Sequence, residues 1–234
     1  MPNAHTLIKV SRFVGHAAGL EKTLRLLQSC SQVVAAHSLP VASAPWLQAR
    51  SQLALGRRYL RFLKFIDAFA LAFGAFSSHN NGIVAALEFG KWSCMGMFLF
   101  LESCTILDAM AIYRSNWAAG LFVEAMKFWF YSLTLGILQA LIELWGLSWQ
   151  GSAMRKEDEG EDEKVGKKAA LDHESRARQR RSKRWNVVKK IMIDGCDLSI
   201  PGSITGWLAV SSSNVGILCI VSTVLAGYDI WDKI

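Results

Sequence analysis

Apolar residues near the N-terminus recur at helical spacing, but they do not stay on one side. A first stripe covers residues 7–17, and a second stripe over residues 20–27 lies about a quarter turn away from it. Because the shift falls across Gly15 and Gly19, we expect two helices, or one kinked helix, at the start of the chain. The stretch HSLPVASAP (37–45), with two prolines and several small residues, predicts a connection after them.

The stretch ALGRRYLRFLKFIDAF (54–69) predicts a strongly amphipathic helix. Its basic face consists of Arg50, Arg57, Arg58, Arg61 and Lys64. Its apolar face consists of Leu55, Tyr59, Phe62, Leu63 and Ile66. A helix of a soluble bundle also has one apolar stripe, but its polar side usually includes acids, and this basic face has none. The pattern is typical of a helix that lies in a membrane surface, where each basic residue near anionic lipid contributes about 1 kcal/mol.

Two later segments are apolar enough to suggest membrane spans. Residues 128–142 carry no charge, but they extend only about 22 Å as a helix. Since a hydrocarbon core of about 30 Å needs about 20 residues, a span here must continue past Glu143 to residue 149, and a buried bundle helix is the alternative. The charge-free run 198–228 is longer, and residues 204–228 predict the clearer span, with small residues that permit close helix packing.

Between these segments the composition changes. RKEDEGEDEK (155–164) mixes acids and bases, and RARQRRSKRWNVVKK (176–190) has eight basic residues and no acid. Such charge blocks bury too little apolar surface to become ordered, so we expect a flexible linker. The predicted fold is an all-α membrane protein. Its parts are an amphipathic helical region (1–76), a hydrophobic helical or transmembrane region (83–149), the charged flexible linker (150–197) and a C-terminal transmembrane segment (198–234).

The composition supports a membrane partner. The 234 residues are 52% hydrophobic, yet the net charge is +7 and the pI is about 9.3, whereas a soluble domain that basic is normally less apolar. Up to Lys64, nine Lys or Arg residues stand against one acid, Glu21. The five cysteines are scattered without a CxxC pair, so neither a disulfide framework nor a zinc site fits. Basic residues interrupt the first apolar stretch, so we expect insertion through internal segments rather than an N-terminal secretory signal.

No pattern of residues indicates catalysis. The five histidines are dispersed without metal-ligand spacing, and the chain has no phosphate-binding loop and no GxSxG motif. We therefore expect no enzyme, no metal and no cofactor. The arginine-rich run in 176–190 could bind nucleic-acid phosphates, but a soluble DNA-binding domain does not need a long uncharged run. We expect anionic membrane lipids as partners of the basic residues, and no nucleic acid.

Three stretches, in this order, resemble the peroxin-eleven family of peroxisomal membrane elongation proteins. They are GLEKTLRLLQ (19–28), GRRYLRFLKF (56–65) and WLAVSSSNVGILCIVSTVLAGYDIW (207–231). Lys22, Arg25 and Gln28 match the opening motif of that family, and Arg58, Arg61 and Lys64 match its basic helix. The resemblance covers nearly the whole chain apart from residues 150–195, and the order and spacing of the motifs are more specific than each motif alone.

The resemblance implies a protein of the peroxisomal membrane that elongates this membrane and promotes peroxisome division and proliferation. Family members insert the amphipathic helix into the cytosolic leaflet, tubulate the membrane and recruit the fission machinery. A helix buried about 5–10 Å deep expands one leaflet relative to the other. We accordingly expect the apolar face to form a membrane wedge and the basic face to contact lipid headgroups. A persistent bend needs many copies, so a homo-oligomer is expected as well.

The sequence leaves two other functions open. The protein could be a channel or transporter for small metabolites, with Glu102, Asp108 and Glu143 lining a pathway. It could also be a scaffold that only recruits division proteins. In that case changes on the basic face would leave the shape of peroxisomes unaltered.

The number of spans is also open. Two spans, at 128–149 and 204–228, suit the cytosolic termini that the family resemblance implies. They would nevertheless place the basic N-terminal region and the basic run 176–190 on opposite sides, although basic loops prefer the cytosol. A third crossing near 92–113 would bring the two basic regions to one side but would send the C-terminus to the other.

Overall fold

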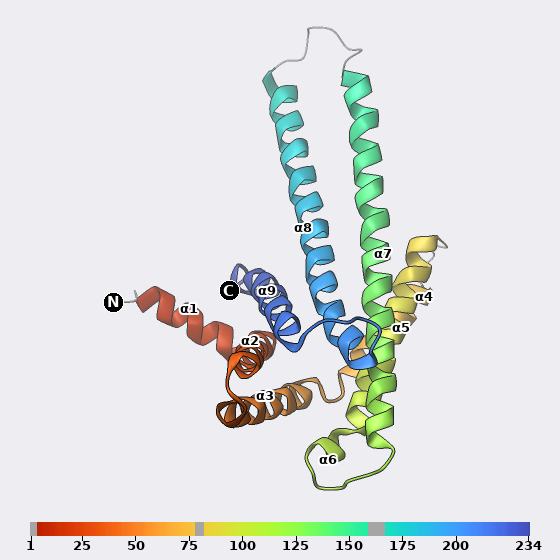
Figure 1. The fold of residues 1–234 in the computed structure, drawn as a ribbon. Helices are drawn as coiled ribbons and strands as arrows, with labels where there is room; N and C mark the ends of the chain where they lie inside the picture. The colour runs from red at the N-terminus through yellow and green to blue at the C-terminus, as the bar shows by residue number, and fades with distance from the viewer. Residues whose placement is uncertain (1–3, 78–81, 159–166) are drawn as a thin grey trace.

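The computed structural model describes residues 4–77, 82–158 and 167–234, and all regular structure in these ranges is helical (Figure 1). The helices are α1 (Ala4–Gly15), α2 (Ala17–His37), α3 (Pro40–Arg61), α4 (Lys64–Ser77), α5 (Ile83–Cys104), α6 (Ile106–Ala109), α7 (Ala118–Asp158), α8 (Lys167–Thr205) and α9 (Ser212–Trp231). Within the described residues, three helical segments are long and apolar enough to cross a membrane: Ile83–Cys104, Ala118–Trp149 and Ser212–Trp231. These observations confirm the predicted all-α membrane fold.

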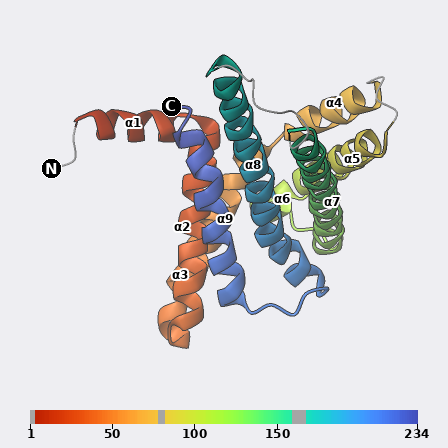
Figure 2. The same cartoon turned by 90° about the horizontal axis from the view of Figure 1, so that it is seen from above.

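The helices form two groups that α8 joins. In the first group α2 packs against α3 and α9, and in the second α5 packs against α4 and α7. α8 contacts both α7 and α9, and Figure 2 shows it between the two groups. The hydrophobic core lies in the second group, where Phe98 of α5 stacks on Trp129 of α7 with ring centroids 5.1 Å apart. The first group instead holds a buried polar network, described below.

Three interruptions of the helical backbone bear on the predicted elements. At His16 the backbone is extended between α1 and α2, as the shift of the apolar stripe predicted. At Leu63 the φ angle is +71°, a left-handed conformation that costs a residue with a side chain about 1–2 kcal/mol, and it separates α3 from α4. At Gly206 the φ angle is +77°, which glycine adopts without that cost, and it ends α8. The predicted helix over 54–69 and the predicted span 204–228 are therefore each interrupted.

The structure differs from the sequence-based prediction in two connections. Residues 40–45 are not a connection, because α3 begins at Pro40 and continues through Pro45. Proline suits the first turn of a helix, where its missing N–H has no intrahelical partner. The segment expected to be a flexible linker is helical wherever it is described, in α7 up to Asp158 and in α8 from Lys167. Lys, Arg, Ala and Glu favour helix strongly, and α7 and α8 run side by side (Figure 1).

Gly216 allows the close approach of α9 to α2. A Cβ atom at this position would lie 2.7 Å from Cγ2 of Val33 and 3.4 Å from the carbonyl oxygen of Ser29. The small residues of the C-terminal segment thus do pack a helix interface at this point, as small residues in membrane helices commonly do.

We expect Gly216→Val to destabilise the protein by about 1–3 kcal/mol, because the added side chain overpacks the α2–α9 interface. Gly146→Val on α7 is the matched control, since a Cβ there meets nothing within 4 Å. Thermal unfolding of both variants in a mild detergent, followed by circular dichroism, measures the difference. Equal unfolding temperatures for the two variants would contradict the proposed role of Gly216.

Candidate functional site

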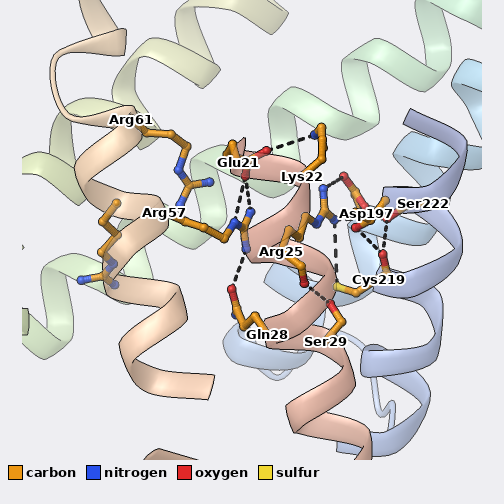
Figure 3. A network of polar contacts seen from close by, with 12 residues as sticks. Glu21, Lys22, Arg25, Gln28, Ser29, Arg57, Arg61, Asp197, Cys219 and Ser222 are labelled. Atoms are coloured by element: carbon orange, nitrogen blue, oxygen red, sulfur yellow. Dashed lines mark hydrogen bonds and ion pairs between the residues drawn. The ribbon is translucent and has the colours of Figure 1, made fainter. Parts of the chain in front are cut away.

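The three residues of the N-terminal motif lie on α2, and the structure places them in a polar network rather than on the surface. Figure 3 shows α2 between α3 on one side and the α8–α9 pair on the other. Nζ of Lys22 lies 3.3 Å from Oε2 of Glu21, its neighbour in the chain. Arg25 faces α8 and α9, and Gln28 faces α3. The motif therefore connects three parts of the fold.

Arg25 forms a buried ion pair with Asp197 of α8. Its Nη1 donates to Oδ2 of Asp197 at 3.0 Å, its Nη2 donates to Oδ1, and Nη2 also donates to Oγ of Ser222 at 3.2 Å. Arg25 and Asp197 are 4% and 7% exposed. Burial alone would lower the pKa of Arg25, but the adjacent carboxylate outweighs it and raises this pKa above its ordinary value. The guanidinium is thus held in its charged form, and its contacts tie α2 to α8 and α9.

Arg57 forms the second ion pair, on the other side of α2. Its Nε and Nη2 each lie 2.8 Å from Oε1 of Glu21, and its Nη1 donates to Oε1 of Gln28 at 2.8 Å. Burial would raise the pKa of Glu21, but Arg57, Lys22 and Arg61 outweigh it and lower this pKa to about 2. Burial, together with the neighbouring charge of Arg61, lowers the pKa of Arg57 to about 10. The site therefore holds more positive charge than its acids neutralise.

Glu102 of α5 forms the third group of ion pairs, with two arginines of α3. Nη2 of Arg61 donates to Oε1 of Glu102 at 2.8 Å, and Nε of Arg58 lies 3.6 Å from the same oxygen. Each guanidinium also lies over an aromatic ring: Arg58 is 4.6 Å from the ring centroid of Phe122, and Arg61 is 5.8 Å from that of Phe98. These contacts link the two helix groups at the C-terminal end of α3.

A cavity of about 500 Å³ lies between the two groups, beside this network. α3 lines one wall with Arg50, Arg57, Arg58 and Arg61, and α5 and α7 line another with Phe98, Phe122, Met126 and Trp129. A second cavity of about 310 Å³ adjoins it and shares four lining residues with it: Ser51, Ala54, Arg58 and Phe122. Four of the five residues of the predicted basic face therefore face the interior of the protein. The fifth, Lys64, is exposed at the start of α4.

The apolar face has the opposite environment. Tyr59, Phe62, Leu63 and Ile66 are between 44% and 57% exposed, and Leu55 is partly buried against the second cavity. Exposed apolar residues continue along α4 at Phe69, Phe73 and Phe76. An exposed apolar surface of this extent marks a contact with a membrane or another protein. The structure thus leaves four of the five residues of the apolar face exposed, on both sides of the helix break at Leu63.

The carboxylates of the network were not identified by the sequence analysis as partners of the arginines. Glu21 precedes the motif residue Lys22, and Glu102 and Asp197 lie 41 and 172 residues away in sequence from the arginines they bind. For Glu102, an isolated acid in an apolar stretch, its position in the sequence was the available signal that it has a buried basic partner.

Of the three carboxylates considered for a transport pathway, Glu102 and Asp108 line the two cavities, whereas Glu143 is exposed on α7. Among the described residues, no three metal-ligating side chains converge.

The whole arrangement of helices is covered by one family model. The model described as Peroxisomal biogenesis factor 11 (PEX11) matches residues 7–231. The chain belongs to the PEX11 family. No curated protein and no solved structure shows significant similarity to it.

Membership of the PEX11 family fixes the location and the general role. This PEX11 protein is a peroxisomal membrane protein, and it acts in peroxisome biogenesis and division. The three helical segments long enough to cross a membrane agree with that location. PEX11 is a family of membrane biogenesis factors and not a known family of enzymes. Both the network and the cavity lie inside the matched range.

We expect Asp197→Asn to destabilise this PEX11 protein by about 3–5 kcal/mol, because it leaves the charge of Arg25 buried without a carboxylate. Asp229→Asn is the matched control: Asp229 pairs with Lys189 but its side chain is 44% exposed, and such pairs contribute about 1 kcal/mol or less. Chemical unfolding of both variants in mixed micelles measures the difference. A similar loss in both would show that Arg25 does not depend on Asp197.

The stability of the protein should fall as the pH decreases from about 5 to about 2. The pKa of Glu21 is lowered in the folded state from its ordinary value near 4.5 to about 2, so its contribution is complete above the higher value and is lost as pH falls through the lower one. Glu21→Gln should remove this part of the pH dependence. Unfolding midpoints measured at several pH values for the wild type and the variant test it, and parallel curves would refute it.

Proposed function

We propose that this PEX11 protein bends the peroxisomal membrane by seating the corner between α3 and α4 in the cytosolic leaflet. The observation that carries the proposal is the exposure of Tyr59, Phe62, Leu63 and Ile66 around this corner, followed by exposed phenylalanines along α4. A helix side buried at the headgroup boundary expands one leaflet relative to the other. The spanning helices would keep the protein in the membrane independently of this insertion.

The fold supports a rigid wedge rather than a peptide that folds when it reaches the membrane. Arg57, Arg58 and Arg61 are bound to Glu21 and Glu102, so the polar side of α3 is fixed to α2 and α5. The apolar side is consequently held outward before any lipid is met. Preorganisation of this kind lowers the conformational cost of insertion.

The prediction that the basic face contacts headgroups is retained here in a narrower form. Lys64 is exposed beside the apolar face, so we expect it to reach anionic headgroups. Arg50, Arg57, Arg58 and Arg61 line the cavity, and their contact with bilayer lipid stays a prediction that depends on movement of α3.

Association of several copies and recruitment of the fission machinery are further parts of the proposal. One inserted corner displaces little lipid, whereas an array of corners produces a lasting bend. α5, α7 and α9 expose large apolar side chains, such as Phe89, Trp145 and Val224, that could face lipid or a second copy. Division proteins would then assemble on the narrowed membrane.

The double variant Phe62→Ser with Ile66→Ser should abolish most membrane tubulation by the full-length protein. Moving each large apolar side chain out of water contributes about 1.5–3 kcal/mol, so the variant loses most of the insertion free energy of the corner. The measurement is electron microscopy of vesicles with a peroxisome-like anionic lipid composition, into which the wild type and the variant are reconstituted at equal density.

The control removes two apolar residues elsewhere that are even more exposed, Leu39→Ser with Val41→Ser at the α2–α3 corner. This variant should tubulate vesicles like the wild type. The proposal would be wrong if the Phe62/Ile66 variant, inserted and folded, still formed tubules at the wild-type frequency. A protein that only recruits division proteins would then explain the family role better.

A further inference from the structure

The cavity beside α3 carries a positive charge that the protein does not balance. Of its four arginines, Arg57 is paired with Glu21, and Arg58 and Arg61 share one oxygen of Glu102. Arg50 has no ion-pair partner among the residues that the structure describes. Four guanidinium groups therefore line the cavity with one carboxylate, Glu102, among its lining residues.

One unpaired donor, together with the electrostatic environment of Arg57, indicates that this charge lacks a partner. Nε of Arg61 is buried and has no hydrogen-bond partner. A buried donor without an acceptor costs free energy, and such groups in native proteins call for an explanation such as an absent ligand. Burial and the charge of Arg61 also disfavour the protonated form of Arg57, as its lowered pKa shows. An anion among these side chains would satisfy the donor and offset the repulsion.

The opposite wall of the cavity is apolar. It is formed by Phe98, Met126 and Trp129 of the core, with Ile200 of α8 and Val215 of α9 closing it. The volume of about 500 Å³ is within the range of about 300–1,000 Å³ that small-molecule sites in proteins have. A small inorganic anion would leave this apolar wall uncovered, whereas a molecule with an apolar chain would cover it.

We propose that the cavity binds a single-chain anionic amphiphile, with its carboxylate or phosphate group among Arg50, Arg57 and Arg61. The chain lies along the aromatic wall of α5 and α7. The head group accepts hydrogen bonds from the guanidinium groups, in the charge-assisted geometry for which arginine is suited. The site is on the side of α3 away from the apolar face, so it is separate from the proposed membrane wedge and does not depend on it.

Calorimetric titration of the full-length protein in a neutral detergent tests the proposal. The probes are dodecanoate and dodecyl phosphate, with dodecanol and inorganic phosphate as the chain-only and head-only controls, and empty micelles give the background. We expect saturable binding of one molecule of the two anionic amphiphiles, and no saturable binding of either control. The tighter of the two probes identifies the preferred head group, and a free acid is thereby distinguished from a phosphate ester.

Two variants and one matched control keep the test specific. Arg50→Gln should weaken binding about tenfold or more, which is the loss of one charge-assisted hydrogen bond, and Arg50 has no ion pair whose loss would disturb folding. Ala54→Phe, which fills the cavity without changing its charge, should abolish binding. Arg12→Gln removes the same charge from the exposed surface of α1 and should bind like the wild type, and circular dichroism verifies that all three are folded.

Several results would overturn the proposal. Dodecanol binding as tightly as dodecanoate would make the site purely apolar, and inorganic phosphate binding as tightly as dodecyl phosphate would make it a simple anion site. Equal losses in Arg50→Gln and Arg12→Gln would assign the effect to general electrostatics, and unaltered binding in Ala54→Phe would place the ligand elsewhere. The Phe62/Ile66 variant should bind the amphiphile normally, so failure of the wedge and failure of the cavity site are separate outcomes.

Discussion

The buried ion pair between Arg25 and Asp197 holds the N-terminal helices to the C-terminal ones. A guanidinium with almost no exposure to solvent requires a carboxylate, and here that carboxylate comes from a helix 172 residues further along the chain. α2 is thereby fixed against α8 and α9. Its other side can then present Glu21 and Gln28 to α3, and the position of Arg57 follows from those contacts.

This arrangement gives the two sides of α3 different environments. The arginines point inward because acids on α2 and α5 receive them, and the aromatic and aliphatic residues are left outward as a result. In water such an exposed surface would be unfavourable, but at the boundary of a bilayer it is stabilising. The polar interior of the first helix group, whose ion pairs Figure 3 shows, and its apolar exterior are thus two results of the same set of ion pairs.

The sequence was sufficient for the helical class, the membrane location and the break at His16, because each depends on local periodicity or composition. It was not sufficient for the environment of the basic face. A helical wheel shows that Arg57 and Arg61 share a side, but not whether lipid phosphates or distant carboxylates such as Glu102 meet them. The break at Leu63 was also missed, since leucine rarely adopts a positive φ. The charged segment was expected to be flexible because composition does not reveal that α7 and α8 support each other.

The length of α7 determines how much of this helix can lie outside the bilayer. A helix of 41 residues is about 60 Å long, about twice the thickness of the hydrocarbon core of a bilayer. If Ala118–Trp149 crosses the bilayer at the usual tilt of about 20°, nearly half of this length stands in the aqueous phase, with α8 beside it (Figure 1). The part of α7 after Trp149 and the part of α8 beside it would then form a stalk outside the bilayer, where a soluble protein would meet them before reaching the lipid.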